Sequence, residues 1–113
     1  MNTRNEHMNQ ADLAVAGTSQ STATPVVTPS PAFIYAGTSG GDGTAGIRLP
    51  KAAKGKMFTV KNAYNGNIRV YPASGDAINA LGTDTQLVMA ALTSATFIAR
   101  DSTTWYTIPL LPS

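Results

Sequence analysis

The chain has 113 residues, no cysteine and one histidine, and only 12% of its residues are charged, with a formal net charge of +2. This length suits one small domain, whose thin core favours support from a partner or from oligomerisation. The lack of cysteine excludes a disulfide framework and a thiolate metal site. So weak a charge does not indicate nucleic-acid binding, and no apolar run reaches the length of a membrane crossing or a signal peptide.

Residues 1–31 differ in composition from the rest of the chain. They are rich in Asn, Gln, Ser, Thr and Ala and contain no aromatic residue. Alone, such a segment buries too little surface to offset its ordering entropy, and its closing prolines favour polyproline II. We expect an extended N-terminal arm over 1–31, either a floppy terminus or a segment that orders along another protein. The β body is then expected over 32–113.

The stretch 57–72 predicts a central β-hairpin. Phe58 and Val60 alternate with polar residues, and Ile68 and Val70 do the same. A period of two over β-branched and aromatic residues, bounded by Asn and Gly, is typical of strand–turn–strand. The four apolar residues are expected to share one buried face.

The length of the turn in this hairpin is decided by which loop places the four apolar residues on one face of the sheet. A two-residue Asn65-Gly66 turn would send the two apolar pairs to opposite faces, whereas a three-residue loop at 64–66 places them together. Gly66 is then expected in the left-handed conformation, as the bulge residue of the loop. Pro72 cannot donate to a strand ladder and is expected to end the second strand.

Further strands are expected at 33–35, 47–49, 86–90, 95–99 and 104–108. A glycine-rich loop separates the first two, and a turn at 100–103 joins the last two as a hairpin. Around Ile78 the pattern suits either one helical turn or a short strand. About seven short strands without a long helix predict an all-β fold, a small β-sandwich or jelly-roll-like barrel.

The sequence offers little for catalysis. His7 lies in the arm, and the β body contains no histidine or glutamate that could serve as a base. Its four aspartates, Asp42, Asp76, Asp84 and Asp101, lie in predicted turns, where carboxylates bond to nearby backbone amides. A calcium site built from loop carboxylates is the alternative. We expect no enzymatic activity and no cofactor.

Two sets of side chains suggest surface contacts. Six of the eight basic residues are Arg48, Lys51, Lys54, Lys56, Lys61 and Arg69. They indicate either a positive patch for an acidic partner or a solvated loop that protects strand edges. The aromatic residues that could stack sugars, or else fill the core or an interface, are Tyr64, Tyr71, Trp105 and Tyr106.

The runs 58–62, 68–81 and 105–108 together resemble small β-domain virion proteins of tailed bacteriophages. The resemblance covers roughly residues 43–113, and Val-Tyr-Pro-Ala-Ser-Gly-Asp-Ala-Ile-Asn at 70–79 is its most specific part. It implies a capsid decoration (cement) protein, a trimer on the outer shell that clamps neighbouring major capsid proteins. A head-fibre or tail structural module is the alternative, and a carbohydrate-binding module is the second alternative.

Contact residues follow from the apolar and basic patterns under this interpretation. Capsid contacts are expected from Leu13, Val15, Val26, Val27, Lys51, Lys54 and Lys56, and trimer contacts from Trp105, Ile108, Leu110 and Leu111. The expected partners are the major capsid protein and two further copies of the chain, without nucleic acid or membrane. The protein is then expected on the outer capsid surface of the virion, after synthesis in the host cytoplasm.

Overall fold

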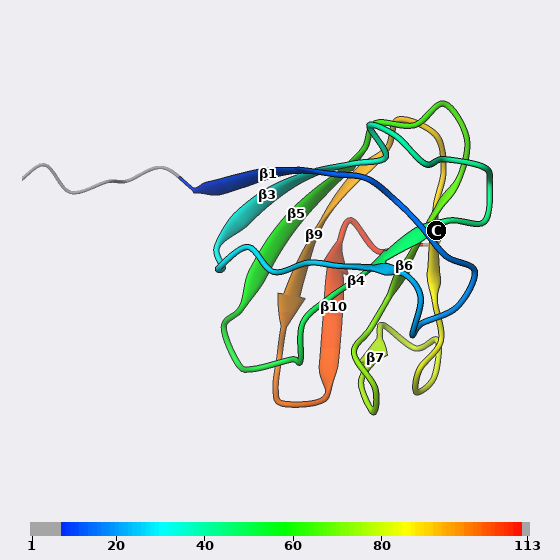
Figure 1. The fold of residues 1–113 in the computed structure, drawn as a ribbon. Helices are drawn as coiled ribbons and strands as arrows, with labels where there is room; N and C mark the ends of the chain where they lie inside the picture. Colours follow the sequence, from blue (N-terminus) through cyan, green and yellow to red (C-terminus); the bar gives the residue numbers. More distant parts are fainter. Residues whose placement is uncertain (1–7, 112–113) are drawn as a thin grey trace, which may run out of the picture.

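The computed structural model describes residues 8–111, and within them it contains ten strands and no helix. The strands are β1 (Asn9–Leu13), β2 (Thr24–Pro25), β3 (Ala32–Ala36), β4 (Gly46–Arg48), β5 (Met57–Asn62), β6 (Ile68–Tyr71), β7 (Ala77–Ile78), β8 (Leu87–Met89), β9 (Ser94–Ala99) and β10 (Thr104–Ile108). They form a six-stranded sheet, β1-β3-β5-β9-β10-β7, and a four-stranded sheet, β2-β4-β6-β8 (Figure 1). The all-β class is confirmed.

The first six strands alternate between the two sheets. β1, β3 and β5 lie parallel in the larger sheet, and β2, β4 and β6 lie parallel in the smaller one. Each consecutive pair is therefore one coil of a solenoid-like stack. The arrangement differs from the expected sandwich or jelly roll because the chain crosses to the other sheet after each strand. A crossover brings strands together in parallel, whereas a tight turn makes them antiparallel.

The last strands close the stack in antiparallel fashion. β9 pairs with β5 and with β10, and β8 pairs with β6. The hairpin expected at 100–103 is confirmed, since β9 and β10 are adjacent and the Arg100 N–H donates to the Thr104 carbonyl over 2.9 Å. Ile78 belongs to the short strand β7, which runs parallel to β10.

One hydrophobic core lies between the sheets. Inward residues of neighbouring strands stack in rows, for example Ala32, Phe58 and Phe97 in the larger sheet. The expected burial of Phe58, Val60, Ile68 and Val70 is confirmed, because none of them is more than 1% exposed.

The prediction of a central hairpin at 57–72 is wrong, because β5 and β6 belong to different sheets. Residues 63–67 cross from one sheet to the other instead of reversing the chain. Gly66 does not adopt the left-handed conformation; it makes room for the Tyr64 ring, whose Cε2 would lie 2.7 Å from an added Cβ. Pro72 does follow the last residue of β6, as expected.

The arm expected over 1–31 is also wrong for residues 8–31, which form the first coil of the body. β1 pairs with β3 along its whole length, and β2 pairs with β4. Val15, Ala23 and Val26 are at most 4% exposed. Residues 1–7, including His7, lie outside the described residues. The polar composition of this segment suggested disorder. A strand at the edge of a sheet, however, is held mainly by backbone hydrogen bonds to its neighbour and needs few large side chains.

Phe58→Ala tests the core. Phe58 is 1% exposed and its ring centroid lies 5.9 Å from that of Trp105, so the variant should lose about 3–5 kcal/mol of unfolding free energy. Urea denaturation measures the loss. Val27→Ala is the control, since Val27 is 82% exposed, and it should change stability by less than about 0.5 kcal/mol. Equal effects of the two substitutions would contradict the position of the core.

Candidate functional site

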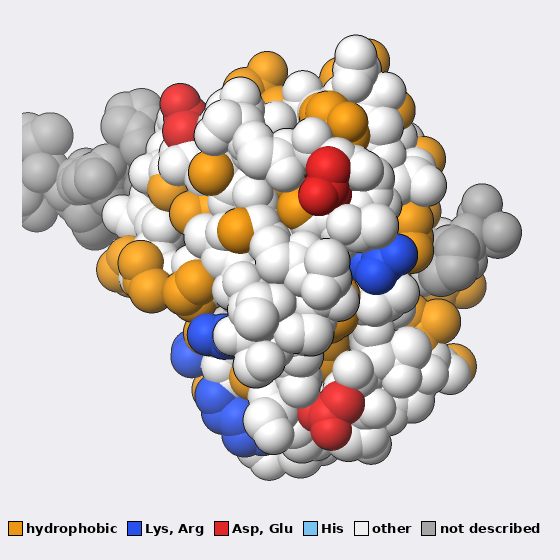
Figure 2. All heavy atoms as spheres, turned by 45° about the vertical axis from the view of Figure 1, so that its right-hand side comes forward, with side chains coloured by type: hydrophobic (Ala, Val, Ile, Leu, Met, Phe, Trp, Pro, Cys, Tyr) orange, Lys and Arg blue, Asp and Glu red, His pale blue; other side chains and the backbone are white. Residues whose placement is uncertain are grey.

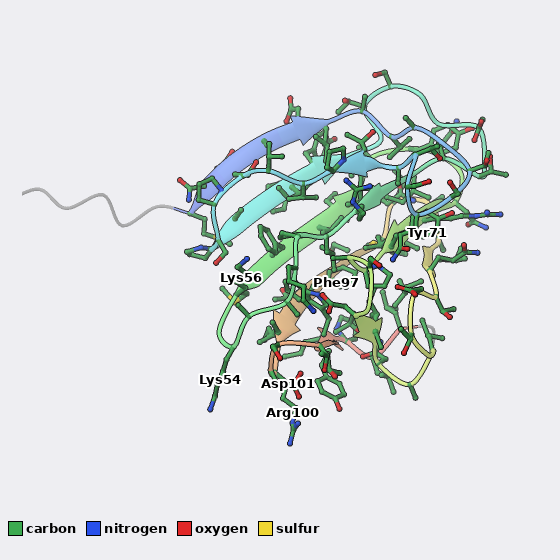
Figure 3. The ribbon with its side chains drawn as sticks, turned by 60° about the horizontal axis from the view of Figure 1, so that its bottom comes forward. Lys54, Lys56, Tyr71, Phe97, Arg100 and Asp101 are labelled. Atoms are coloured by element: carbon green, nitrogen blue, oxygen red, sulfur yellow. The ribbon has the colours of Figure 1, made fainter. Side chains whose placement is uncertain are left out.

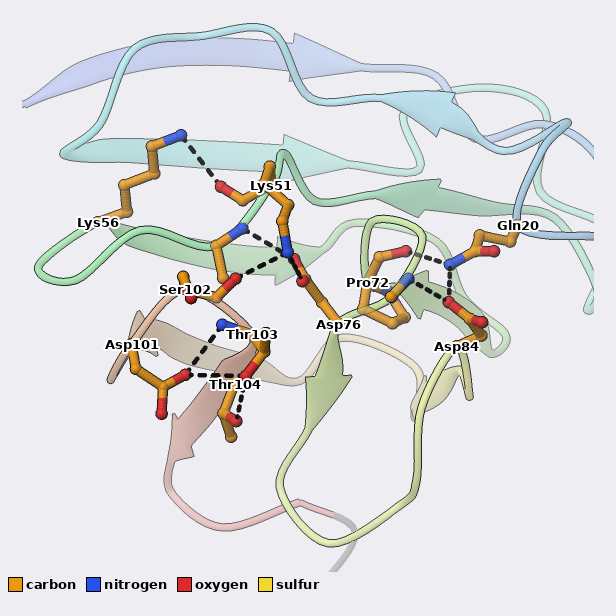
Figure 4. A network of polar contacts seen from close by, with 12 residues as sticks. Gln20, Lys51, Lys56, Pro72, Asp76, Asp84, Asp101, Ser102, Thr103 and Thr104 are labelled. Atoms are coloured by element: carbon orange, nitrogen blue, oxygen red, sulfur yellow. Dashed lines mark hydrogen bonds and ion pairs between the residues drawn. The ribbon is translucent and has the colours of Figure 1, made fainter.

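A buried carboxylate joins three loops (Figure 4). Asp76 is completely buried, accepts the Ala52 N–H over 2.8 Å and forms an ion pair with Lys51. The Lys51 ammonium also donates to the Ser102 carbonyl over 2.7 Å. Asp76 therefore holds the loops that precede β5, β7 and β10 together. Its turn position was predicted, but its burial was not, because nothing in the local sequence distinguishes it from the other aspartates.

The other three body aspartates bond to nearby amides. Asp42 accepts the N–H groups of Thr44 and Ala45, each over 2.8 Å, and these bonds lower its pKa. Asp101 accepts the Thr103 N–H over 2.9 Å, which lowers its pKa. These contacts fit the turn interpretation. Among residues 8–111, no three potential metal-ligating side chains of the His, Cys, Asp or Glu type come together.

Asp84 links the first coil to the loop after β6. It accepts the Gly75 N–H over 2.7 Å and the Gln20 side-chain amide over 3.1 Å. The Gly75 bond and then the Gln20 bond lower the pKa of the Asp84 carboxyl. Gln20 also donates to the Pro72 carbonyl over 2.8 Å. Its side chain therefore holds the loop after β6, through Pro72, and the loop after β7, through Asp84.

Several of the basic residues are directed at the protein's own carbonyl groups. Arg48 donates to Gln20, Lys56 to Lys51 and Lys61 to Leu92. Lys54 is exposed and points away from the body (Figure 3). In Figure 2 most of the visible basic side chains cluster at the lower left, and another lies apart on the right. Much of this charge thus stabilises loops, whereas the exposed Lys54 is free to contact a partner.

The expected capsid contacts divide by exposure. Val15 and Val26 point into the core at 2% and 4% exposure, so their assignment as contacts is wrong. Leu13 is half-buried against the core, while Val27 is 82% exposed. The alternation that buries Val26 leaves Val27 outside, as it does in any strand-like segment.

The expected trimer contacts divide in the same way. Trp105 is completely buried against Phe58, so it cannot touch another copy or a sugar. Tyr71 is only 4% exposed, which also removes it from any stacking role. Ile108 and Leu110 are each 63% exposed, and Leu111 packs partly on the core.

A partly exposed apolar surface is the outer side of β3, β5, β9 and β10, here called the outer face. Burial alternates along all four strands. The apolar residues that this alternation turns outward are Phe33, Tyr35, Met57, Ile98, Tyr106 and Ile108. The rings of Phe33 and Tyr35 stack with their centroids 6.5 Å apart.

The outer face carries almost no charge. Lys61 is the one charged residue in these four strands, and its ammonium bonds to the Leu92 carbonyl. Thr59 and Thr96 share a hydrogen bond of 2.9 Å between their hydroxyls, which partly satisfies the polar groups at its centre. Aromatic enrichment and depletion of charge are typical of the centre of a protein–protein interface. Sequence reasoning missed this face; the signal was the large apolar residues at outward strand positions.

Asp76→Ala tests the buried carboxylate. The substitution removes charge-assisted hydrogen bonds, each worth about 1.5–3 kcal/mol. The Lys51 side chain is 57% exposed, so its ion pair with Asp76 contributes little to stability. We expect a loss of about 1.5–3 kcal/mol in urea denaturation. Lys54→Ala, in the same loop, should be nearly neutral, and a neutral Asp76→Ala would contradict the assigned role.

The lowered pKa of Asp84 predicts that the stability of the fold depends on pH. Its folded pKa lies below the unfolded value of about 3.9. Its stabilisation is therefore complete above that value and is lost as the pH falls through the folded pKa. In urea midpoints measured between about pH 6 and pH 2, Asp84→Asn should show a weaker decline than the unmodified chain. Parallel declines would show that Asp84 contributes nothing to acid sensitivity.

Comparisons with known proteins add no further constraint on this geometry. No family model, curated protein or solved structure matches the chain. Residues 8–111 also contain no helix with the length and apolarity needed to cross a membrane. The function must therefore be inferred from the exposed surfaces described above.

Proposed function

We propose that this protein is a bacteriophage capsid decoration (cement) protein. It binds the outer capsid surface and stabilises the shell by clamping neighbouring major capsid proteins. The observation that carries the proposal is the outer face, an apolar and nearly uncharged sheet surface backed by a complete core. The resemblance of residues 43–113 to phage virion β-domains supplies the capsid as the partner. The protein acts by binding rather than by catalysis.

The size of the outer face indicates how the binding works. Four strands about 4.8 Å apart, with about five residues each at 3.3 Å, cover roughly 300 Å². A standard interface buries about 800 Å² on each partner. A single outer face is therefore a weak contact. A homotrimer joined through the exposed Leu110, which follows β10 and is not part of the outer face, would present three such faces. Multivalent attachment would then raise the affinity without new contacts.

A head-fibre or tail structural module is the second candidate. The observation that favours it is the solenoid-like stack, because parallel coils can continue along an axis. Copy number distinguishes the two roles, since a decoration protein occurs many times on each shell and a fibre or tail module only a few times. The carbohydrate-binding alternative loses Trp105, its main stacking residue, to the core.

Tyr106→Arg tests the docking face. Tyr106 is 45% exposed at the outer face, and a cation there would have to be desolvated on binding. Phage capsids that lack the protein are mixed with each variant and sedimented, and the bound protein is quantified. We expect Tyr106→Arg to lose most of its capsid binding while it keeps the β circular dichroism spectrum of the unmodified chain.

Val88→Arg is the matched control for this experiment. Val88 is 41% exposed but lies on β8 of the other sheet, so the variant should bind capsids as the unmodified chain does. If the unmodified chain does not bind capsids, the decoration function is wrong. If all three proteins bind equally, docking occurs elsewhere, and Lys54 becomes the next residue to replace.

A further inference from the structure

The first coil leaves both sheets open at the same end. β1 is an edge strand of the six-stranded sheet and β2 is an edge strand of the four-stranded sheet (Figure 1). Among residues 8–111, no strand pairs with the outer side of either edge. Solenoid proteins need a capping element or a partner where the stack ends, because an open end leaves strand edges and core side chains uncovered.

The backbone of β1 shows which groups are available. The Asn9 N–H donates to the Pro31 carbonyl over 3.2 Å, and the Gly37 N–H donates to the Leu13 carbonyl over 2.8 Å. In a parallel ladder only alternate residues face one neighbour. Asn9 and Leu13 therefore face β3, and the N–H and C=O groups of Gln10 and Asp12 face outward.

The inward side chains of β1 are also only partly covered. Ala11 continues the buried row of Ile34 and Val60, and Leu13 continues the row of Ala36 and Asn62. Ala11 and Leu13 pack on the core but remain half-exposed, whereas the residues behind them are fully buried. One further strand beside β1 would cover both.

We propose that this strand is β1 of a second copy of the chain, added antiparallel around a two-fold axis. In this register the outward backbone groups of Gln10 bond to those of Asp12 of the second copy, and Ala11 lies on the axis. Each Gln10 side-chain amide then faces a carboxylate of the other copy, so a donor meets an acceptor twice. Centring the axis on Asp12 instead would place two carboxylates in direct opposition, which is unfavourable.

This contact joins the two six-stranded sheets into one and satisfies the free edge of each. It uses neither the outer face nor Ile108 and Leu110, so it is independent of the capsid-binding proposal. The contact is isologous, since the same residues serve both copies. Taken by itself, this contact closes after two copies.

An introduced cysteine gives a direct test of this pairing, because the chain contains no cysteine of its own. With Ala11→Cys, the two thiols face each other at a non-hydrogen-bonded position, where Cα atoms are about 4.5 Å apart. That separation lies within the disulfide range of about 4.4–6.8 Å. We expect mild oxidation of the folded variant to convert most of it into a covalent dimer on non-reducing gels.

Leu13→Cys is the matched control. Its thiol faces the same side of β1, but in the proposed register Leu13 lies opposite Asn9 of the second copy. The two copies of residue 13 are then roughly 13 Å apart along the strands, so Leu13→Cys should form no covalent dimer under the same oxidation. No dimer of Ala11→Cys, or equal dimer of both variants, would overturn the proposed pairing.

A proline variant tests the edge without a thiol. Asp12→Pro removes an outward N–H while it leaves the bonds from β1 to β3 in place. In sedimentation experiments it should abolish the dimer formed through β1, while Asp12→Asn, which keeps both the N–H and a side-chain acceptor, should retain it. Equal association of Asp12→Pro and Asp12→Asn would show that β1 is not the contact.

Discussion

The fold depends on burial of the inward rows between the two sheets. Ile34, Val60 and Ala95 form one such row in the larger sheet, and Ile47, Val70 and Leu87 form another in the smaller sheet. Each inward residue contacts its own row and the facing sheet, so apolar area is removed from water across the whole stack. The parallel register follows from this constraint, because a shift by one residue would turn every inward side chain outward.

The sequence predicted the strands better than their partners. The alternation around Phe58 and Ile68 correctly identified two strands and their buried residues. It could not tell a hairpin from a crossover, because both require the same period of two. What decides the path is Asn62, whose side chain bonds to the Gly66, Met89 and Ala90 carbonyls and to the Tyr64 N–H. These contacts are distant in sequence or involve the backbone, so no local pattern reveals them.

The candidate site was less predictable for a related reason. The sequence placed Val15 in the expected arm, as a capsid contact, and left Trp105 between the core and an interface, with a trimer contact as the choice. The structure uses both to complete the core. Conversely, Tyr35 and Ile98 resembled ordinary strand residues, yet they face outward. Which face of a strand is covered depends on the second sheet, and its position follows only from the full topology.

The outer face stays apolar for a structural reason. A sheet in a two-layer fold buries one side, and its other side is covered only by a third layer or a partner. This protein has no third layer among its described residues, and yet Phe33, Tyr35 and Tyr106 stand where polar residues would keep the surface hydrated. Lys61 and the paired hydroxyls of Thr59 and Thr96 are the main polar features of this surface. An uncovered apolar face does not help the isolated chain, because it favours aggregation. Its presence on a fully packed sheet supports the proposal that this face docks on another protein.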